Sequence, residues 1–233
     1  MDKHTITPAQ LAGCIDHTLL KAYAAAKDIE KLCGEAREYR FYGVCVNGSR
    51  VELARHYLED TGVKVACVAG FPLGAPSADV KRYETEAAVD EGAHEIDVVL
   101  NLGRLKDGDN ATVLRELRDV VEAADDRPVK VILETCLLTR EEIIRACRLA
   151  VESGARFVKT STGFGAGGAT VEDVKLLREI VGPGFGVKAS GGIRDAQTAL
   201  AMIEAGATRL GTSAGVAIMR GFVGDKAQGA ASE

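Results

Sequence analysis

Short apolar runs alternate with longer amphipathic segments along nearly the whole chain. The longer segments repeat apolar residues every three to four positions, as amphipathic helices do. Together with turn residues, the pattern predicts eight strands, at residues 14–20, 43–47, 64–69, 93–100, 129–134, 157–159, 186–189 and 208–211. It predicts a helix after each strand, at residues 28–39, 49–59, 77–90, 111–124, 139–151, 171–180, 195–204 and 214–219, and one short helix before the first strand, at 7–12.

Capping signals support several of these boundaries. Thr7-Pro8 places an N-cap residue and a proline at a helix start. Thr139 has a glutamate three residues later, which is a capping box. Asp28 and Ser77 are expected to cap two further helices. A glycine that can take the left-handed conformation ends three helices just before a strand. These glycines lie in Glu91-Gly92-Ala93, Ser153-Gly154-Ala155 and Ala205-Gly206-Ala207.

The strand–helix alternation predicts an α/β fold. Strands separated by helices are usually parallel and joined by right-handed crossovers. Eight such units favour a closed (β/α)8 TIM barrel over an open doubly wound sheet, and the chain of 233 residues is close to the roughly 250 typical of such barrels. No linker-like stretch divides the chain, so we expect one domain over residues 1–220. The small, polar residues 221–233 are expected to form a flexible tail.

Composition narrows the classes of function. The chain is 46% hydrophobic and 27% charged, as ordinary globular proteins are. Its net charge of −5 argues against a general nucleic-acid surface. No signal peptide or membrane-length apolar run is visible, so a cytoplasmic location without membrane contact is expected. The six cysteines and four histidines lack metal-ligand spacing, which favours free thiols and no bound metal.

Charged residues interrupt several strands that should be buried. Side chains alternate between the two faces of a strand, so Ile96 and Val98 facing the helices leave Asp97 pointing into the barrel. The same alternation turns Lys159 and Lys188 inward. Further residues are predicted on this inner face, namely Asp16, Cys45, Lys130 and Glu134.

Two inward lysines and a carboxylate suggest Schiff-base chemistry. For Lys130 and Glu134 alone, a structural ion pair or strand end is the better interpretation, but two lysines on neighbouring strands repel each other. A lysine attacks a carbonyl only when neutral, and its ordinary pKa is about 10.4. Burial and the Lys188 ammonium would lower the pKa of Lys159, and Asp97 could move protons through an ordered water. The residues alone do not decide which lysine is the nucleophile.

Two glycine-containing strand ends predict a phosphate site. The seventh strand ends in Ser190-Gly191-Gly192, and the eighth in Gly211-Thr212-Ser213 before a short helix. Barrel enzymes often bind phosphate with these two loops, where backbone N–H groups and a helix N-terminus attract the anion. Either pair of glycines alone could be a simple turn, but the two at neighbouring strand ends favour phosphate.

Four stretches resemble the deoxyribose-phosphate aldolase family. The resemblance is ordered and extends over about residues 14 to 215. The stretches are Asp16-His17-Thr18-Leu19-Leu20, Glu95-Ile96-Asp97-Val98-Val99, Phe157-Val158-Lys159-Thr160-Ser161-Thr162-Gly163-Phe164 and Val187-Lys188-Ala189-Ser190-Gly191-Gly192-Ile193-Arg194.

The resemblance implies a class I, metal-independent lyase without a cofactor. Such an enzyme reversibly cleaves 2-deoxy-D-ribose 5-phosphate to D-glyceraldehyde 3-phosphate and acetaldehyde, in deoxyribose phosphate catabolism. By motif position, Lys159 matches the Schiff-base lysine, and Lys188 and Asp97 match the proton donors and acceptors. The matched substrate-binding positions are Asp16, Thr18, Cys45 and Thr160. The matched phosphate-binding positions are Gly163, Gly191, Gly192, Gly211 and Ser213.

One position departs from the family pattern, and two alternatives stay open. Phe164 stands where some members carry lysine, which weakens the expected hold of this loop on phosphate. Another phosphosugar-handling barrel is one alternative, either a different Schiff-base aldolase or a phosphosugar isomerase. An isomerase would need only a carboxylate or histidine base and would leave Lys159 without a role. A catalytically silent sugar-phosphate-binding barrel is the other, and the Lys-Lys-Asp set argues against it.

A homodimer or higher homo-oligomer is expected, because barrel proteins often form such assemblies.

Overall fold

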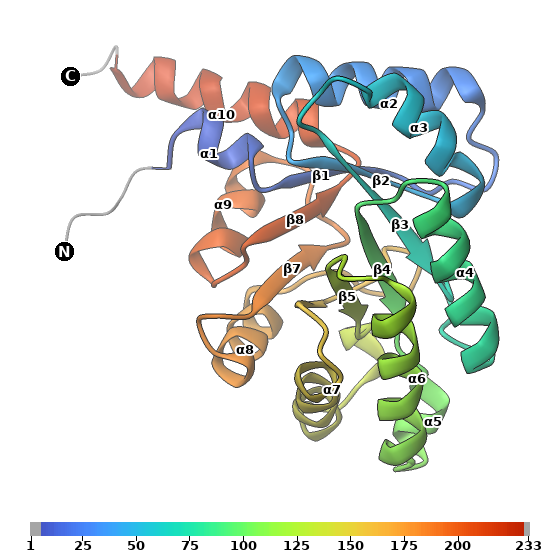
Figure 1. Ribbon diagram of the computed structural model, residues 1–233. Helices are drawn as coiled ribbons and strands as arrows, with labels where there is room; N and C mark the ends of the chain where they lie inside the picture. Colours follow the sequence, from blue (N-terminus) through green and yellow to red (C-terminus); the bar gives the residue numbers. More distant parts are fainter. Residues whose placement is uncertain (1–5, 231–233) are drawn as a thin grey trace.

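Eight parallel strands form a closed barrel in the computed structural model, which describes residues 6–230 (Figure 1). Neighbours in the sequence are neighbours in the sheet, and β1 closes the ring by pairing with β8. The strands are β1 (Ile15–Leu19), β2 (Gly43–Val46), β3 (Lys64–Ala69), β4 (Glu95–Val99), β5 (Val129–Ile132), β6 (Phe157–Lys159), β7 (Gly186–Ser190) and β8 (Arg209–Thr212). The predicted TIM barrel is confirmed.

Helices surround the barrel, and α10 extends away from it beside α1 (Figure 1). The helices are α1 (Pro8–Ala12), α2 (Ala26–Tyr39), α3 (Val51–Leu58), α4 (Ala78–Asp90), α5 (Leu102–Lys106), α6 (Asn110–Ala123), α7 (Arg140–Glu152), α8 (Val171–Val181), α9 (Ala196–Glu204) and α10 (Gly215–Ala230). Two 3₁₀-helices, η1 (Gly48–Arg50) and η2 (Thr135–Leu137), lie in loops after β2 and β5. The short N-terminal helix expected before the first strand is α1.

Some local predictions are confirmed and others are wrong. Thr7 and Thr139 each cap a helix through a capping box. Asp28 is not the N-cap of α2: it lies three residues inside, where its carboxylate accepts from the N–H of Ala25 (2.9 Å). Helix α5 was not predicted, because a single helical turn leaves too short a pattern to recognise. It begins where the Asn101 side chain accepts from a backbone N–H of that turn.

The last helix is longer than the sequence suggested. The helix expected at 214–219 continues to Ala230, so residues 221–230 of the expected tail are helical. Phe222 is one reason, because its side chain is buried against the rest of the molecule. Residues 231–233 lie outside the described part of the chain.

Strand alternation separates two kinds of interior. Outward-facing residues such as Val44, Ile96 and Val187 join the helices in one continuous apolar core. Inward-facing residues are mainly polar, and the strand register sets them side by side. Lys130 is the register partner of Asp97, and Lys188 is the partner of both Lys159 and Arg209. The fold therefore gathers charges from distant parts of the sequence inside the barrel.

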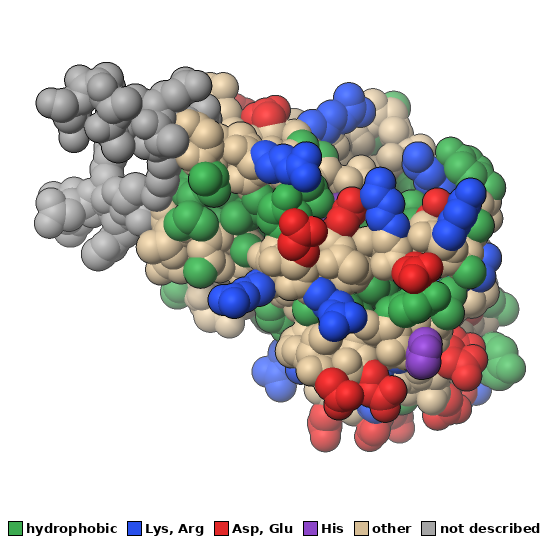
Figure 2. All heavy atoms as spheres, turned by 90° about the horizontal axis from the view of Figure 1, so that it is seen from above, with side chains coloured by type: hydrophobic (Ala, Val, Ile, Leu, Met, Phe, Trp, Pro, Cys, Tyr) green, Lys and Arg blue, Asp and Glu red, His purple; other side chains and the backbone are tan. Residues whose placement is uncertain are grey.

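The two signs of charge are mixed on one face of the molecule. Figure 2 shows basic and acidic side chains interspersed over the visible face. Within residues 6–230, no helix combines the length and the apolar character needed to span a bilayer.

Candidate active site

A network of buried charges fills the inside of the barrel. Its members are linked by direct ion pairs, and none is more than 6% exposed. They are three carboxylates, Asp16, Glu95 and Asp97, and four cations, Lys130, Lys159, Lys188 and Arg209. The network therefore holds more cations than carboxylates.

Asp97 is the centre of this network. Its Oδ2 accepts from Lys159 Nζ at 2.9 Å and from Lys188 Nζ at 2.8 Å. Its Oδ1 accepts from Lys130 Nζ at 2.6 Å. Burial alone would raise the pKa of Asp97, but the three ammonium groups outweigh burial and hold that pKa well below its ordinary value. Asp97 is therefore ionised at neutral pH.

Lys188 lies between two carboxylates. Its Nζ is 2.5 Å from Asp16 Oδ2 and 2.8 Å from Asp97 Oδ2. Burial favours a lower pKa for Lys188, but Asp16 and Asp97 more than reverse this and raise the pKa above its ordinary value. Lys188 thus stays charged, and Lys159 shares its acceptor oxygen with a permanent cation.

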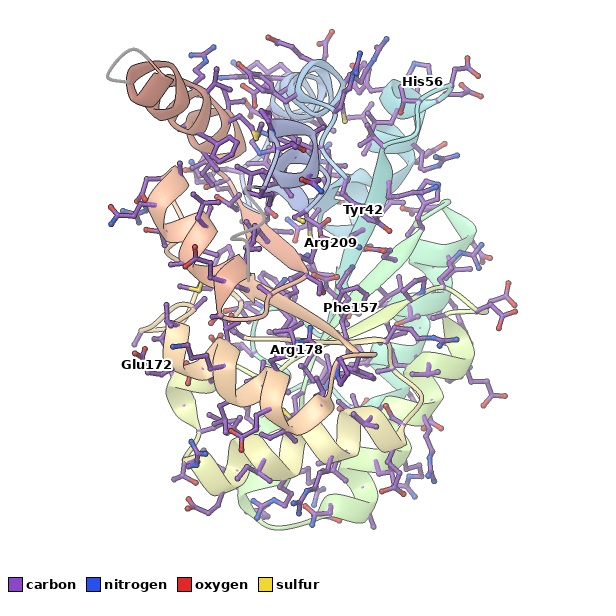
Figure 3. All side chains as sticks on the ribbon, turned by 90° about the vertical axis from the view of Figure 1, so that its left-hand side faces the viewer. Tyr42, His56, Phe157, Glu172, Arg178 and Arg209 are labelled. Atoms are coloured by element: carbon purple, nitrogen blue, oxygen red, sulfur yellow. The ribbon has the colours of Figure 1, made fainter. Side chains whose placement is uncertain are left out.

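Arg209 closes the floor of the barrel. Its Nη1 lies 3.1 Å from Asp16 Oδ1 and 3.0 Å from Glu95 Oε2. Its guanidinium stacks on the Tyr42 ring, 3.3 Å from the ring centre, and Figure 3 shows it between Tyr42 and Phe157. Arg209 and Glu95 were not predicted as site residues, although Glu95 lies two residues before Asp97 and so shares its face of β4.

The opposite side of the interior is apolar. A small cluster here contains Leu20, Cys45, Ala66 and Val68, with Phe71 packed against it. Burial raises the pKa of the Cys45 thiol, so this thiol is neutral. Lys159 and Asp97 therefore face a charged wall on one side and an uncharged wall on the other.

A cavity of about 260 Å³ opens at the carboxyl ends of the strands. Of the three predicted catalytic side chains, only Lys159 reaches its wall, because Asp97 and Lys188 lie beneath. The cavity brings together most of the predicted binding positions, namely Thr18, Gly163, Gly191, Gly192, Gly211 and Ser213. This is the edge of the barrel where active sites of TIM-barrel enzymes lie.

Three predicted substrate-binding residues do not line this cavity. Asp16 is buried against Lys188 and Arg209, and Cys45 belongs to the apolar cluster. Thr160 Oγ1 donates to the carbonyl of Ser190 and accepts from its N–H, both at 3.1 Å. Thr160 therefore joins the ends of β6 and β7 below the cavity.

Two cations on the cavity wall were not predicted. Lys21 follows β1, and Arg194 follows β7. Neither forms an ion pair with a described residue, and Lys21 Nζ lies 5.8 Å from the centre of the Tyr23 ring. Only their positions in the sequence could have indicated them. Lys21 directly follows the stretch that ends at Leu20, and Arg194 is the last residue of the stretch that begins at Val187.

Phe164 forms an uncharged part of the cavity wall. Its side chain is 56% exposed, and its ring meets that of Phe71 edge-on, with 5.2 Å between ring centres. The loop after β6 therefore brings no side-chain cation to the cavity at this position. The cations Lys21 and Arg194 come from other loops.

Comparison with known proteins shows the family of this chain. Residues 11–222 match the family model described as DeoC/LacD family aldolase. The chain belongs to the DeoC/LacD aldolase family. The resemblance inferred from the sequence motifs is therefore confirmed.

Relatives within this aldolase family cover nearly the whole chain. The chain is 59% identical over 210 residues to the deoxyribose-phosphate aldolase of Alkaliphilus oremlandii, covering 90% of this chain and 95% of the relative. It is also 59% identical to that of Thermococcus gammatolerans, covering 91% and 96%. The tetrameric deoxyribose phosphate aldolase of Aeropyrum pernix superposes with a TM-score of 0.87 at 36% identity, covering 93% of this chain and 92% of that one.

Proposed function

We propose that this family member reversibly cleaves 2-deoxy-D-ribose 5-phosphate to D-glyceraldehyde 3-phosphate and acetaldehyde through a Schiff base on Lys159. The observation that carries the proposal is the position of Lys159. It is the one lysine of the buried network that opens on the cavity, and it shares the Asp97 Oδ2 atom with a charged lysine. The relatives' names support the choice of substrate.

The substrate phosphate would lie at the glycine-lined end of the cavity. Gly191 and Gly192 have positive φ angles of 86° and 80°, a conformation that suits glycine. Ser213 lies just before the start of α10, where unpaired backbone N–H groups favour an anion. Lys21 and Arg194 would add positive charge from the sides. The sugar C1 would then point toward Lys159.

The reaction begins when the neutral Lys159 amine attacks C1 of the open-chain sugar. Water leaves, and an iminium ion forms. Loss of the C3 hydroxyl proton breaks the C2–C3 bond, whose electron pair moves toward the iminium nitrogen. D-Glyceraldehyde 3-phosphate departs and leaves an enamine on Lys159. Protonation of C2 and hydrolysis by water then release acetaldehyde and restore the lysine.

Asp97 and Lys188 are suited to the proton transfers. Asp97 is ionised and can accept the proton that Lys159 loses before attack. Lys188 stays protonated, because Asp16 and Asp97 raise its pKa above the ordinary value. The proton that reaches C2 of the enamine would pass from these two groups through an ordered water.

The test is Lys159→Leu, a change that keeps side-chain bulk but cannot form an imine. We expect acetaldehyde release from the deoxysugar phosphate to fall by at least about 10⁴-fold. Borohydride treatment with acetaldehyde should form an adduct on the unsubstituted protein and none on the variant. Lys175→Leu, an exposed lysine on α8, is the matched control and should retain both. Acetaldehyde release by a folded Lys159→Leu variant would refute the mechanism.

Two broader expectations also stay predictions. A homo-oligomer is supported by the tetrameric Aeropyrum pernix relative, whose barrel superposes on this one. A cytoplasmic location is supported by the sequence pattern described above.

A further inference from the structure

Glu134 is a buried carboxylate outside the barrel network. It follows the end of β5 in the left-handed conformation, with φ 52°, which is uncommon for a residue other than glycine. The alternation pattern predicted that its side chain points into the barrel. This prediction is wrong, because β5 ends at Ile132 and the backbone turns before Glu134. Glu134 is 4% exposed, yet no Lys or Arg among the described residues forms an ion pair with it. A buried carboxylate in this position needs hydrogen-bond donors.

The donors come from the loop after β6. The N–H of Thr162 lies 3.4 Å from both carboxylate oxygens of Glu134. Thr162 Oγ1 donates a short hydrogen bond to Glu134 Oε2 and accepts from the N–H of Phe164 at 3.0 Å. The Cys136 thiol donates weakly to Oε1 over 3.9 Å. Glu134 is therefore hydrogen-bonded to Thr162, whose Oγ1 in turn accepts from Phe164, and both of these residues line the cavity.

The glycines of the same loop allow this close approach. A Cβ atom on Gly165 would lie 3.1 Å from Glu134 Cδ, and one on Gly167 would lie 2.7 Å from Cys136 Cβ. Gly168 packs against the backbone of Gly191 on the phosphate side. Gly163 is different, because its φ of 83° gives it a turn conformation at the cavity wall. The loop is thus held between Glu134 and the phosphate glycines.

We propose that Glu134 is a positioning residue that holds the loop after β6 against the phosphate end of the cavity. It does not reach the cavity wall, so it acts through Thr162 and the backbone of Gly163 and Phe164. A carboxylate suits this role because its oxygens accept from both the N–H and the O–H of Thr162. The inference rests on the proposed function for the identity of the anionic group.

The predicted effect is selective for the phosphorylated substrate. In Glu134→Ala we expect kcat/KM for 2-deoxyribose 5-phosphate to fall about 10- to 100-fold, mainly through KM, as loss of charged hydrogen bonds would cause. For unphosphorylated 2-deoxyribose, kcat/KM should change less than about threefold, because Lys159 lies in β6, whose backbone pairing with β5 and β7 does not involve the Glu134 side chain. Borohydride trapping of acetaldehyde on Lys159 should persist. Glu134→Gln keeps an acceptor for the Thr162 N–H, so its KM for the phosphorylated substrate should return most of the way to the unsubstituted value.

A matched control separates this role from general destabilisation. Glu142→Ala removes a carboxylate that also accepts a backbone N–H, that of Thr139 at 2.8 Å, but away from the cavity, and it should leave both substrates unaffected. If Glu134→Ala does not fold, kcat/KM for the two substrates is compared in Glu134→Gln instead. There we expect a smaller fall in kcat/KM, confined to the phosphorylated substrate. An equal loss for both substrates, or no loss for either, overturns the proposal. Failure of the proposed function would appear separately, as absence of acetaldehyde release from the unsubstituted protein.

Discussion

Lysine is fully buried in two different surroundings in this molecule. Outside the barrel, Lys81 of α4 donates to Glu116 of α6 at 2.5 Å and to the carbonyl of Val99 at 2.9 Å. Inside the barrel, Lys159 and Lys188 share one oxygen of Asp97. The first is a closed pair of one cation and one carboxylate. The second belongs to a network with surplus positive charge and one end on a cavity.

The two surroundings affect their lysines in opposite directions. Burial lowers the pKa of Lys81, and Glu116 only partly reverses the effect. For Lys188 the attraction of Asp16 and Asp97 exceeds the effect of burial, and the pKa rises. Lys81 also packs across Gly70, where a Cβ would lie 2.8 Å from its Cε. The closed pair therefore joins elements of the fold, whereas the open network offers a lysine to a substrate.

The largest effect on stability is expected for a change at Glu116. Glu116→Gln leaves Lys81 buried without its carboxylate, so we expect the free energy of unfolding to fall by about 3–5 kcal/mol. Activity per folded molecule should stay within about twofold, since neither residue lines the cavity. Urea unfolding and acetaldehyde release measure the two quantities. If activity falls while stability is unchanged, the distinction between the two lysine sites is wrong.

The stability that ionised Asp97 provides should decrease at acid pH. A carboxyl group whose pKa is lowered on folding stabilises the protein fully above its unfolded pKa, about 3.9, and this stabilisation is lost as the pH falls through the lower folded value. We expect the unsubstituted protein to exceed Asp97→Asn in stability by a constant margin from pH 7 to about 5, and by less below about pH 4. Urea midpoints from pH 7 to 3 measure the margin. A margin that stays constant to pH 3 would show that Asp97 does not provide this stabilisation.

The smallest effect is expected for the exposed cation Lys21. Lys21→Met should raise KM for the phosphorylated sugar about fivefold at low salt, and less at high salt, because exposed charges are screened by water and ions. KM for unphosphorylated 2-deoxyribose should not change. Lys31→Met is the control, since Lys31 is an exposed lysine on α2 that does not line this cavity. Equal effects of the two variants would remove Lys21 from the phosphate site.

The sequence predicted much of the site because strand alternation is a local property. Once β4, β6 and β7 were located, the aliphatic neighbours of Asp97, Lys159 and Lys188 were enough to turn these three residues inward. The same reasoning was wrong for Glu134, because the alternation holds only while the strand continues. It also left out Arg209, which lies directly beside Lys188 in the register of β7 and β8.

Residues close together in the chain decided three features: the order of the elements, the inward faces of the strands and the glycine-rich strand ends. Only the tertiary structure decided which lysine opens on the cavity and which carboxylate each cation meets. The contact between Lys188 and Asp16 joins residues 172 positions apart, and no local pattern specifies that pairing. It exists because the barrel closes, β1 against β8, and brings the first and last strands together around one buried interior.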